Sequence, residues 1–165
     1  MDDIVLIGNK IPTLQEVKSW LGKCFAMKDL GEAAYILGMR ILRNRSKRLI
    51  RLSQSTYLDK VLKRFNMQNS KKGELHIQSN ARLSKTQSPN TEAEIAEMSR
   101  IPYASAVGSI MYAMTCTRPD VAFALSMVSR YQENPGKAHW TAVKNILKYL
   151  RRTKDCSLPS VGVMT

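Results

Sequence analysis

The sequence opens with Met1-Asp2-Asp3-Ile4-Val5-Leu6-Ile7-Gly8-Asn9, a stretch that decides how the rest of the chain is interpreted. Residues 4–8 form an aliphatic run that is too short for a helix and is stopped by glycine, so they are predicted to form a buried strand. Two adjacent carboxylates beside such a strand resist joint ionisation unless a cation holds them, and Mg²⁺ is the usual cation. The alternative is a solvated acidic terminus without a ligand.

Further motifs follow the acidic pair in one order, and such a string is more specific than any single motif. They are Tyr35-Ile36-Leu37-Gly38-Met39-Arg40-Ile41, Leu52-Ser53-Gln54-Ser55-Thr56-Tyr57-Leu58, Tyr103-Ala104-Ser105-Ala106-Val107-Gly108-Ser109-Ile110-Met111-Tyr112, Thr117-Arg118-Pro119-Asp120-Val121-Ala122 and His139-Trp140. In this order the sequence resembles the reverse transcriptases of copia-type retrotransposons over residues 1–155, as the palm and thumb part of a Pol polyprotein.

The resemblance implies RNA-directed DNA synthesis, with Asp2 and Asp3 as catalytic residues and Mg²⁺ ligands. Met1 stands directly before the pair, so the family's aromatic residue and the strand before it are absent from this sequence. The fingers and the first palm carboxylate of the family are absent as well. Weak Mg²⁺ binding and no polymerisation by the chain alone are therefore expected.

The composition indicates a basic globular protein. Twenty-six Lys and Arg against thirteen Asp and Glu give a formal charge of +13 in 165 residues, which favours a polyanionic partner: RNA, DNA or an RNA–DNA hybrid. Hydrophobic residues make up 44% and charged residues 24%, as in folded domains. No apolar run approaches the ~18 residues of a membrane-spanning helix, so no membrane partner is expected.

The cysteines and the first residues favour an intracellular protein, cytoplasmic or nuclear. Cys24, Cys116 and Cys156 are odd in number and form no C-x-x-C pair, which is typical of reduced thiols. The opening residues also lack the basic segment and the longer apolar run of a signal peptide.

The fold class predicted is α+β: a small antiparallel sheet with packed helices, a polymerase palm remnant, followed by a basic three-helix lobe. Strands are predicted at 4–8, 34–42 and 49–52, with Gly38 marking a bulge or a close backbone approach. Helices are predicted from Pro12 and from Ser53 or Ser55 in the first part. Three more are predicted from Pro102, from about Pro119 and around Trp140.

The domain organisation predicted has four parts. Residues 1–68 form the palm-like remnant with the first thumb helix, and 69–101 form an aperiodic linker with a helical hint at 93–98. Residues 102–155 form the basic three-helix lobe, and 156–165 form an irregular tail.

Basic residues at hairpin and helix positions are the predicted nucleic-acid contacts. Two of these groups have helical spacing, and the cations around them outnumber the acids. The full set is Gly38, Arg43, Arg45, Lys47, Arg48, Lys60, Lys63, Arg64, Lys144, Lys148, Arg151 and Arg152.

Other interpretations stay open. The hairpin tip is equally consistent with an ordinary solvated turn, and the chain could be a domesticated remnant that binds another protein through the open edge of 4–8. Arg40-Ile41-Leu42-Arg43 spells the R-x-L-R string of translocated effectors, but four-letter matches are frequent by chance. Trp140 and Tyr149 are predicted core residues rather than base-stacking platforms.

The acidic pair leads to a first prediction. Nucleotide incorporation on a poly-rA template with an oligo-dT primer should stay at background for the isolated chain, and Asp2→Asn with Asp3→Asn should leave nucleic-acid affinity unchanged or slightly higher. Mg²⁺-dependent extension that disappears in the double variant would show the prediction to be wrong.

Overall fold

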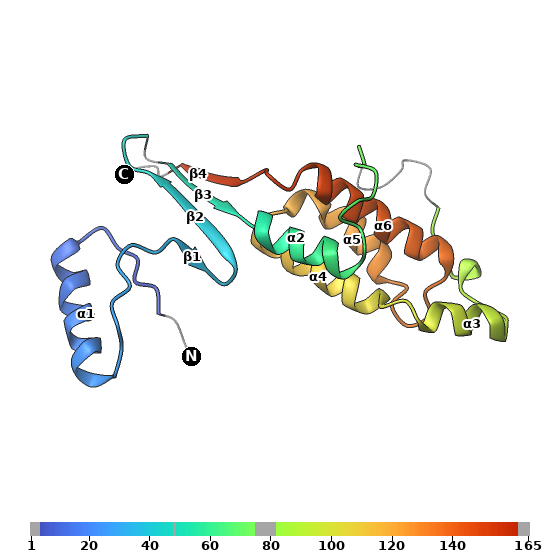
Figure 1. Ribbon diagram of the computed structural model, residues 1–165, viewed down its shortest axis with the longest axis horizontal. Coiled ribbons are helices and arrows are strands. Elements are labelled where there is room, and N and C mark those ends of the chain that lie inside the picture. The colour runs from blue at the N-terminus through green and yellow to red at the C-terminus, as the bar shows by residue number, and fades with distance from the viewer. Residues whose placement is uncertain (1–3, 48, 75–81, 162–165) are drawn as a thin grey trace.

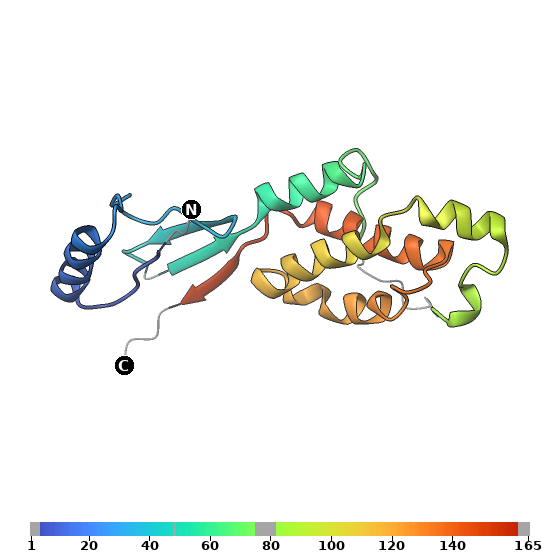
Figure 2. The same cartoon turned by 90° about the horizontal axis from the view of Figure 1, so that it is seen from below.

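The computed structural model describes residues 4–47, 49–74 and 82–161, the last three for their backbone only. The molecule is elongated, with a sheet and helix α1 (Ile11–Cys24) at one end and a cluster of helices at the other (Figures 1 and 2). Two connections join these parts: one leads from β3 (Leu49–Ser53) into α2 (Ser55–Arg64), and the other leads out of α6 (Lys137–Arg152). The predicted α+β class is confirmed.

The sheet is antiparallel throughout, in the order β1-β2-β3-β4. The predicted strand over 34–42 is wrong in one respect, because it is divided into β1 (Tyr35–Ile36) and β2 (Met39–Asn44). Leu37 and Gly38 between them have φ of 47° and 74°, as two-residue hairpin turns of the I′ kind require. Gly38 is therefore a turn residue rather than a bulge.

The predicted hairpin of β2 and β3 is confirmed. Its register pairs Arg40 with Ser53 and Asn44 with Leu49. The Asn44 side-chain oxygen accepts hydrogen bonds from the Ser46 hydroxyl and the Lys47 backbone N–H, at 2.7 and 3.0 Å, which closes the tip as an Asx turn.

Residues 4–8 do not form the predicted strand, and the expected open strand edge is therefore absent. Ile7 is 90% exposed and Ile4 53% exposed. A strand needs a neighbour for its backbone N–H and C=O groups, and no described strand pairs with this segment. An apolar pattern alone was insufficient.

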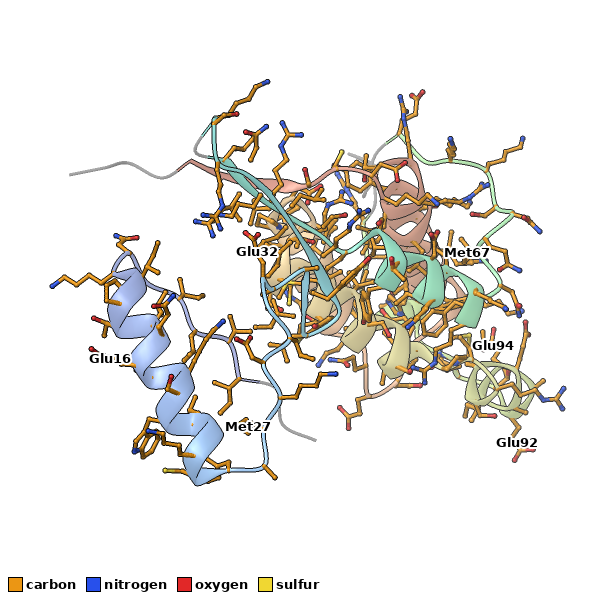
Figure 3. The ribbon with its side chains drawn as sticks, turned by 60° about the vertical axis from the view of Figure 1, so that its left-hand side comes forward. Glu16, Met27, Glu32, Met67, Glu92 and Glu94 are labelled. Carbon is orange, nitrogen blue, oxygen red and sulfur yellow. The ribbon has the colours of Figure 1, made fainter. Side chains whose placement is uncertain are left out.

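Helix α1 forms as predicted, with Pro12 in its first turn, but none of its residues is buried. Its aromatic Trp20 packs edge-to-face on Phe25, with the ring centres 6.3 Å apart, yet both side chains stay more than half exposed. Figure 3 shows the same separation, since Glu16 and Met27 lie well away from the helical cluster. The amphipathic pattern was correct for the helix, while its apolar face contacts little of the described chain.

The tail was predicted to be irregular, but Leu158–Val161 forms strand β4 and pairs with β3. Pro159 lies in this strand opposite Arg51. Proline has no backbone N–H to donate to a neighbouring strand, so it is suited to an edge strand. Strand β4 lies at the edge of the sheet. The partner of β4 lies more than 100 residues earlier in the sequence, beyond the reach of local pattern.

The helical cluster consists of α2, α4 (Tyr103–Cys116), α5 (Ala122–Ser129) and α6, with the short helix η2 (Pro119–Val121) before α5. Each buries one apolar stripe. The side chains buried deepest are Leu58, Val107, Ile110, Val121, Val128, Val143, Ile146, Leu147 and Leu150. Spacings of three and four residues in α6 place its apolar stripe on one face, so the opposite face is left to polar side chains.

The stretch predicted as a linker contains η1 (Lys85–Gln87) and α3 (Glu92–Ser99). The predicted helical hint at 93–98 is confirmed by α3, whose first turn is capped reciprocally by Thr91 and Glu94. Helix α2 packs on α4 and α6 and so belongs to the helical cluster.

The division of the chain into four parts, at residues 1–68, 69–101, 102–155 and 156–165, stays a prediction.

Gly136, at the start of α6, leads to a second prediction. A Cβ at this position would lie 1.9 Å from the Gln87 carbonyl oxygen, so Gly136→Ala should force the backbone apart and lower the free energy of unfolding by about 1–3 kcal/mol. Gly108→Ala is the control, because a Cβ there meets nothing within 4 Å and alanine favours the helix of α4. Urea unfolding followed by circular dichroism measures both, and equal stabilities of the two variants would contradict the prediction.

Candidate nucleic-acid interface

Two of the sequence motifs meet at the junction between the sheet and the helices. The Thr117 hydroxyl donates to the Gln54 side-chain oxygen at 2.6 Å, although the residues are 63 positions apart. Gln54 is only 1% exposed, and its Nε2 has no hydrogen-bond partner among the described residues. The pair fastens the connection between β3 and α2 to the end of α4.

Arg118 holds the second connection at the same junction. Its guanidinium makes two hydrogen bonds to the Asp120 carboxylate, at 3.0 and 2.7 Å. It also donates to the carbonyl and the hydroxyl of Thr153, at 3.2 and 2.6 Å, directly after α6. The Arg118 side chain is 4% exposed, so the arginine side of this pairing is closed to water, whereas the Asp120 side chain is 39% exposed.

Asp120 is kept ionised by its partners. Burial alone would raise the pKa of its carboxyl, but hydrogen bonds from Arg118 and from the Tyr149 hydroxyl outweigh burial and hold that pKa below its ordinary value. The motif of residues 117–120 therefore serves as a structural anchor. It contains no nucleophile with a base beside it.

The turn of β1 and β2 is attached to α4. The Tyr112 hydroxyl donates to the Leu37 carbonyl oxygen, and Tyr57 packs edge-to-face on Tyr112 with ring centres 4.9 Å apart. Tyr57 in turn donates to the Ser109 carbonyl at 3.1 Å. The predicted contact residue Gly38 thus lies in a turn whose position is fixed by the helical cluster.

His139 is a buried structural residue. Its Nδ1 accepts from the Gly136 N–H at 2.8 Å, so its Nε2 carries the proton and donates to the Ser84 carbonyl at 3.1 Å. Its ring stacks on Tyr131, with ring centres 4.0 Å apart. Trp140 and Tyr149 pack against the core, as predicted.

The predicted metal ligands Asp2 and Asp3 lie outside the described residues. Among those that the structure describes, no three His, Cys, Asp or Glu side chains are grouped so that they could hold a metal ion. Binding of Mg²⁺ by Asp2 and Asp3 stays a prediction.

The predicted contacts on the hairpin already have a carboxylate nearby. Arg45 and Arg43 lie 3.1 and 3.7 Å from the same oxygen of Glu32, which Figure 3 labels. Lys47 is exposed at the tip. Arg48 lies outside the described residues.

The predicted contacts on α2 and α6 lie on the outer faces of these helices. Lys60, Lys63 and Arg64 are exposed, opposite the stripe that α2 buries. On α6, Lys144, Lys148 and Arg151 recur at four and three residues and are half-buried. No ion pair joins any of these six to a described carboxylate, whereas Arg152 lies 3.3 Å from Glu74.

The structure brings together two of the three predicted groups. Helices α2 and α6 pack on one another, so their cations belong to one end of the molecule. The tip of the β2–β3 hairpin lies at the other end (Figure 1).

Two basic residues beside α6 were not predicted as contacts. Lys71 and Lys72 were assigned to the linker, but they lie beside α6, because the Gly73 N–H donates to the Lys148 carbonyl at 3.1 Å. A Lys-Lys-Gly string was the only local signal.

Comparisons with known proteins agree with this arrangement of motifs. Residues 1–78 match the family described as "Reverse transcriptase (RNA-dependent DNA polymerase)". The chain is 50% identical over 157 residues to the "Retrovirus-related Pol polyprotein from transposon TNT 1-94" of Nicotiana tabacum. It is 30% identical over 158 residues to that from transposon RE2 of Arabidopsis thaliana. The chain belongs to the reverse transcriptase family of copia-type retrotransposons.

The chain matches only part of each relative. The matches cover 94% of the chain but 12% of the tobacco protein and 10% of the Arabidopsis protein. A third relative, "Secreted RxLR effector protein 161" of Plasmopara viticola, is 46% identical over 61 residues, which is 37% of the chain and 43% of that protein. The R-x-L-R string itself lies in β2, paired with β3. No solved structure matches the chain.

The described helices include none with both the length and the apolar composition needed to cross a bilayer. The predicted cellular location stays a prediction.

His139 gives a third prediction, on pH. Burial lowers the pKa of the imidazole in the folded chain below its ordinary value near 6.5, although the bond to Ser84 opposes this. The unfolded chain therefore binds more protons just below that value, so stability is full above about pH 6.5 and is lost as the pH falls. Thermal unfolding from pH 7.5 to 5.0 should show this loss, and His139→Gln should reduce it. His76→Gln is the control, since His76 lies outside the described residues; an unchanged profile in His139→Gln would contradict the prediction.

Proposed function

We propose that the chain binds the sugar–phosphate backbone of RNA, DNA or an RNA–DNA hybrid through the outer faces of α2 and α6. The observation that carries the proposal is the set of six cations on these packed helices, none of which has an ion pair with a described carboxylate. Such a set remains available to phosphate groups.

The family supports the proposal, because the profile that matches residues 1–78 is that of an RNA-dependent DNA polymerase. By resemblance, the sheet corresponds to part of a polymerase palm and the helical cluster to part of a thumb. The helices would then follow a duplex backbone, and the turn at Gly38 would lie toward the primer end. Backbone contacts of this kind fix position and carry no sequence information, so little sequence preference is expected.

The charge of the chain is consistent with that proposal. With a formal charge of +13, the chain attracts a polyanion over distances comparable to the Debye length, and attraction weakens as salt is added. We propose binding as the activity of the chain by itself. DNA synthesis is not proposed for this chain, which matches 12% of the tobacco relative and 10% of the Arabidopsis relative.

Protein interaction is a second candidate function, and one observation favours it. Trp20, Phe25 and Ile11 are each more than half exposed on and beside α1, and Ile7 is almost fully exposed. Contiguous exposed apolar patches mark protein interfaces, and among these side chains Trp20 and Phe25 are in contact. If the chain acts in this way, Trp20→Ser should leave nucleic-acid binding unchanged while removing any concentration-dependent association seen by sedimentation velocity.

The nucleic-acid proposal gives a fourth prediction. Fluorescence anisotropy with a labelled RNA–DNA hybrid at 50–200 mM salt should show a steep loss of affinity with salt. Changing Lys144, Lys148 and Arg151 to glutamine should reduce the slope of log affinity against log salt by roughly 2 to 3 units, at about 0.9 per lost phosphate contact.

The matched control variant replaces three cations at the other end of the molecule. Lys10, Lys23 and Lys28 are exposed, on or beside α1, and have no ion pair with described carboxylates. Changing them to glutamine removes the same charge and should alter the slope by less than about one unit. Equal effects of the two triple variants, or no binding by the parent chain at about 50 mM salt, would overturn the proposal.

A further inference from the structure

The segment of residues 71–74 lies against α6 and is held there by three contacts. The Gly73 N–H donates to the Lys148 carbonyl at 3.1 Å, and Glu74 forms an ion pair with Arg152 at 3.3 Å. The backbone also fits closely, since a Cβ at Gly73 would lie 3.0 Å from the Lys148 Cβ and 3.1 Å from the Tyr149 nitrogen. Only glycine allows the segment to approach the helix this closely without a shift.

The close fit brings two exposed lysines to a helix that already carries lysines. Lys71 and Lys72 precede Gly73 directly, and Lys144 lies one helical turn before Lys148. The contact of Gly73 with Lys148 therefore adds two cations to the part of α6 that already carries Lys144 and Lys148. The single acid of the segment, Glu74, is paired with Arg152 and does not neutralise them.

We infer that Lys71 and Lys72, held on α6 by Gly73 and Glu74, form a phosphate-binding site together with Lys144 and Lys148. Repulsion among four like charges disfavours this arrangement unless an anion bridges them. The backbone of a nucleic acid supplies phosphates at a regular spacing, whereas a single small anion would engage only part of the site. The inference deepens the proposed function and rests on it.

The surroundings of the site favour nucleic acid over an anionic membrane. An interfacial membrane anchor combines cations with large apolar side chains that insert among the lipids. No large apolar side chain is exposed in the described part of this surface, 66–74 and α6; those exposed elsewhere include Phe123, Trp20 and Ile7. A polar basic surface suits phosphate contact without insertion.

The test compares two pairs of lysines in the full chain. Lys71→Gln with Lys72→Gln should reduce the salt slope for a labelled RNA–DNA hybrid by roughly 1 to 2 units, so that the fall in affinity between 50 and 200 mM salt becomes smaller by about 3.5-fold per lost contact. Lys23→Gln with Lys28→Gln, on and after α1, removes the same charge and should change the slope by less than about half a unit. Both pairs are exposed, so neither should unfold the chain.

A glycine variant tests whether the segment must be held in place. Gly73→Ala keeps every charge but displaces the segment from α6, so the slope of log affinity against log salt should fall as in the Lys71 and Lys72 variant. Gly108→Ala is the control, because a Cβ there meets nothing within 4 Å, and it should leave the slope unchanged. A wild-type slope in Gly73→Ala would overturn the requirement for the close fit.

The remaining outcomes separate the two proposals. Equal slopes for the two lysine pairs, with binding intact, would overturn this site and leave the proposed function standing. Absence of binding by the parent chain would overturn the proposed function itself. Loss of binding to phosphatidylserine vesicles in the Lys71 and Lys72 variant, with hybrid binding unchanged, would assign the site to a membrane surface and overturn the inference.

Discussion

The buried guanidinium of Arg118 is the interaction on which the arrangement of the molecule depends. It joins the turn before α5 to the end of α6, through Asp120 and Thr153, at the point where the chain leaves the helices for β4. The neighbouring Thr117 holds Gln54, where the chain enters the helices from β3. Both connections between sheet and helices are thus fastened to one turn. A charge buried to this extent is costly unless every donor is satisfied, so the site tolerates few alternative geometries.

The motifs that identify the family therefore act mainly as structure within the described chain. Gln54 meets Thr117, Tyr112 meets the turn of Leu37, and His139 meets the segment at Ser84. Each contact joins segments more than 50 residues apart, so these residues hold distant parts of the chain together. The surface proposed for function lies elsewhere, on the outer faces of α2 and α6, where single side chains contribute charge rather than a required geometry.

Sequence analysis succeeded where structure is determined by neighbours along the chain. The 3.6-residue spacing of α2, α4 and α6 predicted those helices, and their outward cations followed from the same spacing. Prediction from the sequence failed where the pairing partner lies far away along the chain. Residues 4–8 have a strand pattern but no described pairing strand, while β4 has little pattern and pairs with β3. Lys71 and Lys72 were missed for the same reason, since only the contact of Gly73 with Lys148 places them on α6.

The ion pairs of the chain divide into those that a polyanion can replace and those that it cannot. Pairs of Glu32 with Arg43 and Arg45 are half or more exposed, and pairs of that kind contribute about 0–1 kcal/mol, so a phosphate group can displace the carboxylate at little cost. The Arg118 pair is closed to solvent on the arginine side and has further bonds to Thr153. Binding can therefore recruit additional cations on the surface while the junction between sheet and helices keeps its geometry.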